Sequence, residues 1–394
     1  MNYQKNIRVN YAFTFIKNFA VTQGIWMLYL AAHGMTLLQI GLLEGIFHVT
    51  SLLMETPTGV VADLWGRKTS RLIGCALSVV SAALMLFANG FAMFAVSFIV
   101  SALSYNFESG AGDAFVYDSL LLDGREGIYM KIAGWNEVVF QGAGIAALAI
   151  GGWLGNTRYE FAYYAAMGLA AVSLVVGTMM KEPRIGQQAK RTGIWAALKA
   201  QYVDSFAALR GSKRLAYLLL IIPVFSASVT LSFYYMQIAW EDAQASTLTI
   251  GLYLAGSAVA SAAGAALAHR IERRLGERTI LAALPLALAL LILALRIPSV
   301  SLAAFCLLNA FEAVLFVATR AYIHRIVPSA QRATILSLES TLFSFVMIAI
   351  FPLFGAIAGH TGILNGFLGL GALMVVLAVI NGAMVLRKAP ETDA

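Results

Sequence analysis

Long apolar segments recur along the whole chain and constrain its fold more than any other feature. A helix needs about 20 apolar residues to cross a hydrocarbon core about 30 Å thick, and windows of that kind occur twelve times. They lie at about Val9–Ala31, Leu37–Val60, Ser70–Ala88, Phe91–Asp118, Ile128–Leu154, Tyr159–Met180, Leu215–Trp240, Leu248–Ala268, Thr279–Leu295, Val300–Ile323, Ala333–Ala358 and Ile363–Leu386. The sequence therefore predicts an all-α integral membrane protein with twelve transmembrane helices.

The composition excludes a water-soluble protein. Hydrophobic residues make up 60% of the chain and charged residues only 12%, whereas soluble domains carry about 25% charged residues. Cys75 and Cys306 lie in different spans and form neither a disulfide framework nor a metal-binding spacing. There is no Gly-rich phosphate loop and no His-x-x-x-His pattern. We therefore expect no enzymatic activity, no cofactor and no metal.

The distribution of Lys and Arg predicts the orientation in the membrane. Arg158 and Arg296 are the bases of one side. The other side receives the long central loop together with Lys5, Arg8, Arg67, Lys68, Arg71, Arg125, Lys131, Arg270, Arg273, Arg274, Arg278, Arg325, Arg332, Arg387 and Lys388. Both termini are therefore predicted to be cytoplasmic. The first span is too long for a removable signal peptide, so we expect it to stay as a helix. The net charge of +7 reflects this positive-inside bias and needs no nucleic-acid partner.

A basic central segment, residues 181–214, divides the chain. Its bases outnumber its two acids, Glu182 and Asp204; they are Lys181, Arg184, Lys190, Arg191, Lys199, Arg210, Lys213 and Arg214. Within it, Gly193–Leu209 is either an amphipathic helix on the cytoplasmic bilayer surface or a solvated linker. The segment separates an N-terminal bundle, residues 1–180, from a C-terminal bundle, residues 215–394, and each contains six of the predicted spans.

A weak internal match supports a duplication of the six-helix unit. Ala111–Asp118 aligns without gaps on Ala318–Arg325, and the acids Asp113 and Asp118 match the bases Arg320 and Arg325. Likewise Leu275-Gly-Glu-Arg278 corresponds to Trp65-Gly-Arg-Lys68. We therefore predict two pseudo-symmetric six-helix bundles.

The loop after the second span, GVVADLWGRKTSR at residues 59–71, combines a glycine turn, a carboxylate and a basic cluster. Gly59 and Gly66 permit close helix approach and a tight turn. Asp63 is placed to pair with Arg67 or to cap a neighbouring helix N-terminus. These positions resemble the signature loop of major facilitator superfamily transporters, G-x-x-x-D-x-x-G-R-[RK], which is matched by Gly59, Asp63, Gly66, Arg67 and Lys68, with Arg71 as a further matching base.

The resemblance covers the whole chain and implies a gate at the cytoplasmic side. The family commonly links Arg67 of this loop to an acid at the end of the fourth span, here Asp118. Such a cluster would latch the inner gate. In the alternative interpretation the same charges only anchor helices at the membrane interface.

Ionisable groups inside the spans are candidates for function. Glu44, His48 and Glu55 share one face of the second span because their separations are close to whole helical turns. Glu108 lies toward the middle of the fourth span, with Asp113 deeper toward the cytoplasm. Glu55, Glu108 and Asp113 are the predicted proton-coupling carboxylates. A comparable inner depth is predicted for Lys17, Asn18, Asn136, Glu137 and Glu339.

In the resembling family the first, fourth, seventh and tenth helices line a central cavity. This implies a substrate site made of charged and aromatic side chains: Lys17, Trp26, Tyr105, Glu108, Tyr234 and Glu312. Aromatic rings beside a few polar groups suit flat, amphipathic organic molecules. Lys17 has an alternative role, a buried ion pair with Glu55 or Asp113.

These observations predict a monomeric, proton-coupled secondary transporter of the bacterial inner membrane that exports small organic compounds by alternating access. Its partners would be a small-molecule substrate, protons and the lipid bilayer. Antiporter members of the resembling family often carry a Gly-Pro-x-x-Gly-Gly pattern in the fifth span. Here Gly151 and Gly152 are present, but Ala147-Leu148 replaces Gly-Pro. The alternatives are uptake of a small anionic or zwitterionic metabolite, suggested by Lys17 and Arg320, and a membrane receptor or scaffold without transport, which would need no carboxylates within the membrane.

Overall fold

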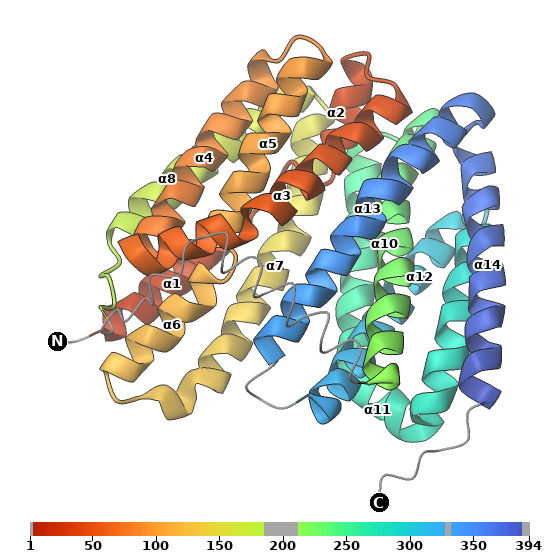
Figure 1. The fold of residues 1–394 in the computed structure, drawn as a ribbon. Coiled ribbons are helices and arrows are strands. Elements are labelled where there is room, and N and C mark those ends of the chain that lie inside the picture. Colours follow the sequence, from red (N-terminus) through yellow and green to blue (C-terminus); the bar gives the residue numbers. More distant parts are fainter. Residues whose placement is uncertain (1–2, 185–211, 328–331, 388–394) are drawn as a thin grey trace, which may run out of the picture. The chain divides into compact units, whose positions relative to one another are not determined.

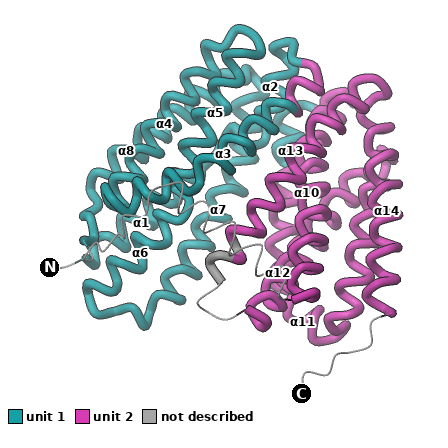
Figure 2. The backbone as a smooth tube through the Cα atoms, viewed as in Figure 1, with its two compact units in different colours: residues 1–35, 42–202, 246–252 teal, residues 36–41, 203–245, 253–394 magenta. Residues whose placement is uncertain are grey.

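The protein is described from a computed structural model, in which residues 3–184, 212–327 and 332–387 are placed. These residues form helices and turns and contain no β-strand (Figure 1). They divide into two compact units, shown in Figure 2. Unit 1 comprises Met1–Met35, Leu42–Tyr202 and Ser246–Leu252, and unit 2 comprises Thr36–Gly41, Val203–Ala245 and Tyr253–Ala394. The central region 185–211, with the amphipathic helix expected at Gly193–Leu209, lies outside the described residues.

Unit 1 is built around contacts of α1 and α4. Its elements are α1 (Gln4–Lys17), α2 (Trp26–Ala32), α3 (Leu37–Trp65), α4 (Arg67–Phe87), α5 (Phe91–Glu108), α6 (Ala111–Leu122), η1 (Glu126–Ile128), α7 (Tyr129–Gly155) and α8 (Tyr159–Thr178). α4 packs against α5, α6 and α8, and α1 packs against α6, α7 and α8. Phe13, Cys75 and Phe115 are fully buried where these helices meet, so the cysteine serves as a small apolar side chain.

Unit 2 surrounds its first helix. Its elements are α10 (Lys213–Asp242), α11 (Thr247–Ala294) from Tyr253 onward, α12 (Ser301–Ile326), α13 (Arg332–Thr361) and α14 (Ile363–Arg387). α10 contacts α12, α13 and α14. In its most apolar window 61% of the residues are buried, against 28–44% in the other candidate spans. α10 is therefore the central helix of the unit.

Among the described residues, ten helical segments are long and apolar enough to cross a membrane. One of them, Thr247–Ala294, has 48 residues and would be about 72 Å long as a straight helix, more than twice the hydrocarbon thickness. Gly276, with φ 76°, interrupts its helical backbone. The two spans predicted at Leu248–Ala268 and Thr279–Leu295 lie on either side of this glycine. The total of twelve crossings stays a prediction.

The first predicted span is not a continuous helix, so the prediction of one helix over Val9–Ala31 is wrong. α1 ends at Lys17 and α2 begins at Trp26. The Asn18 side-chain amide donates a 2.8 Å hydrogen bond to the Thr14 carbonyl, and the Asn18 backbone N–H donates to the same oxygen at 3.1 Å. A side chain that bonds a backbone carbonyl in this way competes with continued helix formation. The fourth predicted span is interrupted too, at Ser109–Gly110, where Gly110 has φ 74°.

Gly151 of α7 packs directly on the break in the first span. A Cβ at this position would overlap the Val21 carbonyl oxygen. Val21 and Ile25 are buried in the same small core as Ala147 and Ala162. This overlap cannot be relieved cheaply, because the atom that the Cβ would strike belongs to the backbone of Val21. The glycine is therefore required by close approach.

We expect Gly151→Ala to destabilise the protein by about 1–3 kcal/mol, the usual cost of forcing an extra carbon into a packed site. The matched control is Gly144→Ala in the same helix, where a Cβ would meet no atom of the described residues within 4 Å. That control should gain about 0.5–1 kcal/mol from helix propensity. Unfolding of both variants in detergent checks the difference, and equal stabilities would contradict the close packing.

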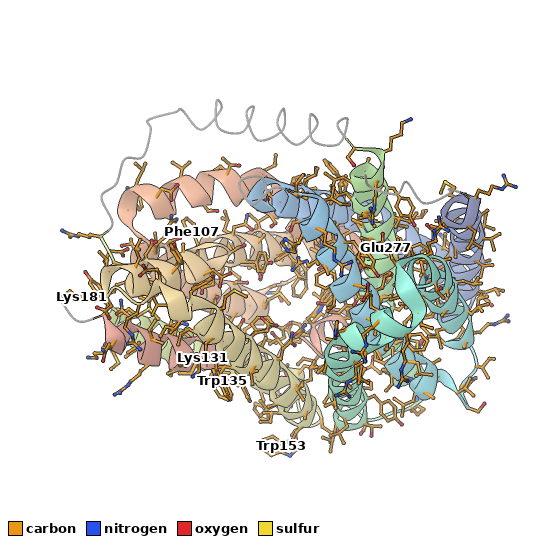
Figure 3. All side chains as sticks on the ribbon, turned by 90° about the horizontal axis from the view of Figure 1, so that it is seen from below. Phe107, Lys131, Trp135, Trp153, Lys181 and Glu277 are labelled. Atoms are coloured by element: carbon orange, nitrogen blue, oxygen red, sulfur yellow. The ribbon has the colours of Figure 1, made fainter. Side chains whose placement is uncertain are left out.

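Two exposed tryptophans, Trp135 and Trp153, lie on α7 (Figure 3). Trp135 and Trp153 are 57% and 63% exposed. They are five helical turns apart on one face, about 27 Å along the axis. Trp is enriched at both membrane–water interfaces, and this spacing is close to the thickness of the hydrocarbon core. Lys131 lies one further turn toward the N-terminus of α7, where a basic residue suits the headgroup region.

Candidate functional site

The signature loop forms a tight turn between α3 and α4. Gly66 has φ 102° and ψ 153°, in the region that favours glycine. The Arg67 Nη1 lies 2.7 Å from Asp63 Oδ1, and the Arg67 Nε lies 3.9 Å from Asp118 Oδ2 at the end of α6. The pairs expected from the sequence are therefore present, with Arg67 between two carboxylates.

The close helix approach expected at Gly59 is absent from this structure. A Cβ on Gly59 would meet no atom of the described residues within 4 Å. Gly59 is exposed on α3, so its lack of a side chain creates no packing contact here. Of the two glycines in the loop, only Gly66 therefore has an observed structural requirement among the described residues, because it forms the turn.

Glu182, which the sequence analysis counted only as a linker acid, completes this cluster. Its Oε1 accepts a 2.7 Å hydrogen bond from the Arg67 backbone N–H, and its Oε2 accepts a 2.9 Å bond from that of Lys68. Lys68 Nζ donates at 2.9 Å to the Thr178 carbonyl. The sequence carries one signal for this contact. Glu182 follows the sixth span directly, near the end of α8, and α8 packs against α4.

Arg71 is the second residue whose role was missed, because it was treated as one more base of the loop. Its side chain is only 2% exposed, and that of its partner Glu108 is 24% exposed. Arg71 Nη2 lies 2.9 Å from Glu108 Oε1, and Nε donates to both carboxylate oxygens at 3.0 and 3.2 Å. The guanidinium also lies 4.2 Å from the Phe13 ring centroid and 5.3 Å from that of Phe115. Such a buried, bidentate pair is costly to break.

The Arg71–Glu108 pair is connected to two further helices. Arg71 Nη1 donates to Asn10 Oδ1 at 2.7 Å, and Asn10 Nδ2 donates to Asn136 Oδ1 at 2.9 Å. Thr14 donates to the same Asn136 oxygen at 2.9 Å. The polar network thereby links α1, α4, α5 and α7 beside the interruption in the fourth span. A change in the charge of Glu108 would therefore alter the interactions of side chains on all four helices.

Lys17 does not form either of the ion pairs that were considered for it. At the end of α1 its ammonium donates to Ser78, and to Ser104 at 3.5 Å. Ser104 in turn donates to the Gly74 carbonyl at 2.8 Å. Within the described part of the chain, no carboxylate pairs with Lys17. The lysine thus presents a positive charge that is solvated by hydroxyl groups.

The other predicted carboxylates of unit 1 have different environments. Glu44 Oε1 lies 3.5 Å from His48 Nε2, so the predicted stripe of α3 brings these two side chains together. Glu55 lies farther along the same helix and has a partly buried side chain. Asp113 is exposed in the first turn of α6. Because the fourth span is interrupted, Asp113 and Glu108 lie on separate helices.

In unit 2, Glu312 and Arg320 have separate partners. Glu312 Oε1 accepts a 2.8 Å hydrogen bond from Ser226 of α10, and none of the described basic side chains lies within 4 Å of it. Arg320 Nε lies 3.5 Å from Glu339 Oε2, and its guanidinium carbon is 4.3 Å from the Phe316 ring centroid. Arg320 is therefore an ion-paired residue, and Glu312 is a carboxylate with no counter-charge among the side chains that the structure describes.

The internal repeat has structural counterparts with reversed charges. Gly276 has a positive φ, as Gly66 does. In unit 1 the base Arg67 lies 3.9 Å from the acid Asp118. In unit 2 the base Arg325, matched to Asp118, lies 3.9 Å from the acid Glu272 of α11. Glu272 does not align with Arg67, however, because the alignment matches Arg67 with Glu277, whose carboxylate lies 2.6 Å from Arg214. Each unit therefore carries an acid–base pair of this kind, but the two pairs are not exact counterparts.

The predicted aromatic residues vary in exposure. Tyr105 is 59% exposed on α5, with its ring centroid 6.1 Å from that of Phe47. Trp26 packs edge-on against Phe98, with 5.6 Å between the ring centroids, and the ring centroids of Tyr234 and Phe351 are 6.1 Å apart. A search of the described residues finds no group of three His, Cys, Asp or Glu side chains that could hold a metal ion.

Solved structures with a similar fold are known transporters. The nucleoside transporter NupG matches with a TM-score of 0.76 at 16% identity, covering 99% of this chain and 100% of that one. A bacterial homologue of the human lysosomal transporter Spinster gives 0.75 at 15%, covering 98% and 97%. A D-xylose-proton symporter gives 0.73 at 14%, also covering 98% and 97%. At these identities the similarity concerns the fold alone.

Sequence comparison identifies the family. The curated relative YxaM, an MFS-type transporter of Bacillus subtilis (strain 168), is 31% identical over 108 residues, 27% of this chain. The match spans about a quarter, 27%, of that relative's length. The sequence profile of the Major Facilitator Superfamily matches residues 9–295 and, in a second match, residues 224–394. The chain therefore belongs to the Major Facilitator Superfamily of membrane transporters.

Proposed function

We propose that this transporter couples the movement of small amphipathic organic compounds to protons and exports them across the bacterial inner membrane. The observation that carries the proton coupling is the buried Arg71–Glu108 pair at the interruption of the fourth span. Protonation of Glu108 would leave a guanidinium that is 2% exposed without its counter-charge. Because that state is unfavourable, proton binding would favour a rearrangement of the helices that the network joins.

The proposed transport cycle is alternating access between the bundles of residues 1–180 and 215–394, with both termini in the cytoplasm and the protein acting as a monomer. Asp63, Arg67 and Asp118 form the proposed cytoplasmic gate, together with Gly59, Gly66 and Lys68 of the signature loop. Glu55 and Asp113 remain further candidates for the proton site. The interruptions in the first and fourth spans fit this proposal, since discontinuous helices commonly form transport sites.

The proposed substrates are lipophilic cations. Glu312 offers a carboxylate whose described partner is a single hydroxyl group, that of Ser226. A carboxylate and aromatic faces attract a cation together, and Tyr234 of α10 is the aromatic candidate of the same unit. Arg320 does not oppose this preference, because it is paired with Glu339.

Uptake of a small anionic or zwitterionic metabolite is the second candidate, and a specific observation favours it. Lys17 lies beside the break in the first span, and its described hydrogen-bond partners are two hydroxyl groups, those of Ser78 and Ser104. An ammonium in that environment is suited to an anionic group of a substrate. The two candidates therefore depend on different residues, Glu312 and Lys17.

Resistance assays in an efflux-deficient host distinguish cation export from anion or zwitterion uptake. We expect expression of the protein to raise resistance to cationic dyes, with Glu312→Gln lowering that resistance at least about tenfold, the effect of about 1.4 kcal/mol of lost binding. Lys17→Ala should leave resistance to cations unchanged. Resistance confined to organic acids and lost in Lys17→Ala would contradict this order.

The direction of coupled proton movement provides a second measurement. In vesicles, a cation exporter moves protons opposite to the substrate, whereas an uptake symporter moves them in the same direction. Absence of any substrate-dependent proton flux would contradict proton coupling in both candidates.

A further inference from the structure

The helix that follows the signature loop begins at a residue with no side chain to cap it. The first N–H groups of a helix lack intrahelical acceptors and are usually capped by a side-chain oxygen of the preceding residue. At α4 that residue is Gly66, which makes no side-chain hydrogen bond. Glycine is required there because φ is positive. The cap of α4 must therefore come from another part of the chain.

Glu182 supplies this cap from 115 residues away in the sequence. Its two carboxylate oxygens accept the N–H groups of Arg67 and Lys68. A Cβ on Gly66 would lie 2.5 Å from the Glu182 carboxyl carbon. Glycine at this position thus serves two purposes, since it allows the turn and leaves room for the carboxylate.

The segment that carries Glu182 is itself held in place. Asn6 of α1 is 2% exposed and bonds the backbone of Lys181 in both directions. The Lys181 N–H donates to Asn6 Oδ1 at 2.8 Å, and Asn6 Nδ2 donates to the Lys181 carbonyl at 2.8 Å. Lys181 is labelled in Figure 3, at the left edge of the view. The backbone immediately before Glu182 is therefore fixed against α1.

We propose that Glu182 is a positioning residue of the cytoplasmic gate, which holds the backbone of Arg67 so that its guanidinium reaches Asp63 and Asp118. This inference rests on the gating role proposed above. One residue, Arg67, is bonded through its backbone to Glu182 and through its side chain to the two acids. Loss of the cap would loosen the turn and spread the guanidinium over more orientations. The start of the cytoplasmic linker would then act directly on the gate.

Two opposing effects act on the ionisation of Glu182. Burial raises the pKa of this carboxyl above its ordinary value of 4.5, although the N–H groups of Arg67, Lys68 and Thr69 and the charge of Lys68 act in the opposite direction. Since its folded-state pKa is raised, this group contributes less stability as the pH rises through the interval between the two values. The ionised cap is thus maintained at some cost to folding.

Amide hydrogen exchange tests the cap directly. In Glu182→Ala we expect the amides of Arg67 and Lys68 to exchange at least about tenfold faster, because each loses a bond to a charged acceptor. Glu182→Gln has nearly the same size and should accelerate one of the two amides, since its NH₂ group cannot accept. Glu126→Ala is the matched control, as Glu126 is exposed in η1. Unchanged exchange in both Glu182 variants would overturn the inference.

Transport tests the positioning role. Glu182→Ala should lower transport several-fold, and Glu126→Ala should not. In a background of Arg67→Ala, adding Glu182→Ala should still accelerate exchange at residue 68, because the cap binds the backbone and not the guanidinium. Faster exchange with unchanged transport, or an equal loss in Glu126→Ala, would overturn the positioning role. The exchange measurement needs no substrate, so it distinguishes failure of this inference from failure of the proposed function.

Discussion

Glu108→Gln is expected to destabilise the protein by about 3 kcal/mol and to abolish gradient-driven transport. The destabilisation follows because Arg71, 2% exposed, loses its counter-charge, and breaking a buried pair from one side costs about 3–5 kcal/mol. We place the loss at the lower end because Glu108 itself is 24% exposed. Arg71→Gln should cost less, since water can reach the carboxylate that remains.

The double variant Arg71→Gln/Glu108→Gln separates folding from coupling. Two neutral amides leave no unpaired charge, so the double variant should recover most of the stability lost in Glu108→Gln. Chemical unfolding in detergent measures this recovery. Strictly additive losses in the single and double variants would show that the two side chains do not depend on each other.

Transport by the stabilised double variant then tests the proton site. We expect loss of accumulation against a gradient with energy-independent exchange retained, because substrate binding does not require the proton. If accumulation persists in the double variant, Glu108 is not the coupling residue. Glu55→Gln and Asp113→Asn are the next variants to test singly, followed by changes at Glu312 and Glu339.

The sequence predicts the membrane class and the ion pairs of the signature loop well because these depend on local composition and on short-range spacing. Long apolar windows and a glycine turn leave direct marks on the chain, and the Arg67 pair with Asp63 is an i,i+4 contact. The break in the first span depends on a weaker signal. A single Asn, hydrogen-bonded to Thr14, ends a helix that hydropathy alone would continue.

Long-range partners could not be predicted for a different physical reason. Arg71 lies one turn beyond Arg67 on α4, and nothing in the local sequence states that one is buried and the other reaches the surface. Arg71 is buried because α1, α5 and α6 pack around its side chain. Glu182 is similar, because its hydrogen bonds join the loop to a segment 115 residues away. Charge patterns therefore predicted the ion pairs of Arg67 but not the carboxylate that caps α4.

Asp63→Asn is expected to reduce transport to background with little effect on folding. Asp63 and Arg67 are 52% and 28% exposed, and an exposed ion pair contributes about 0–1 kcal/mol to stability. A loss of that size would shift a conformational equilibrium only about fivefold. Complete loss of transport therefore requires Asp63 to take part in the gating step, whereas a residue that merely anchors the helix would lower transport about fivefold at most.

Charge exchange across the gate tests its geometry. Arg67→Asp alone should abolish transport, and Arg67→Asp/Asp118→Arg should restore part of it, since the two side chains lie 3.9 Å apart. Restoration should be incomplete because the new acid faces Asp63 one helical turn away, and like charges at that spacing repel. Glu160→Gln is the matched control, as it removes the exposed pair of Arg158 and Glu160, 3.5 Å apart. Its transport should equal that of the wild type. Asp63 and Glu160 have side chains that are 52% and 32% exposed, and each variant removes one such charge. An equal transport rate in both variants would therefore show that the cluster around Arg67 anchors the helices without gating them.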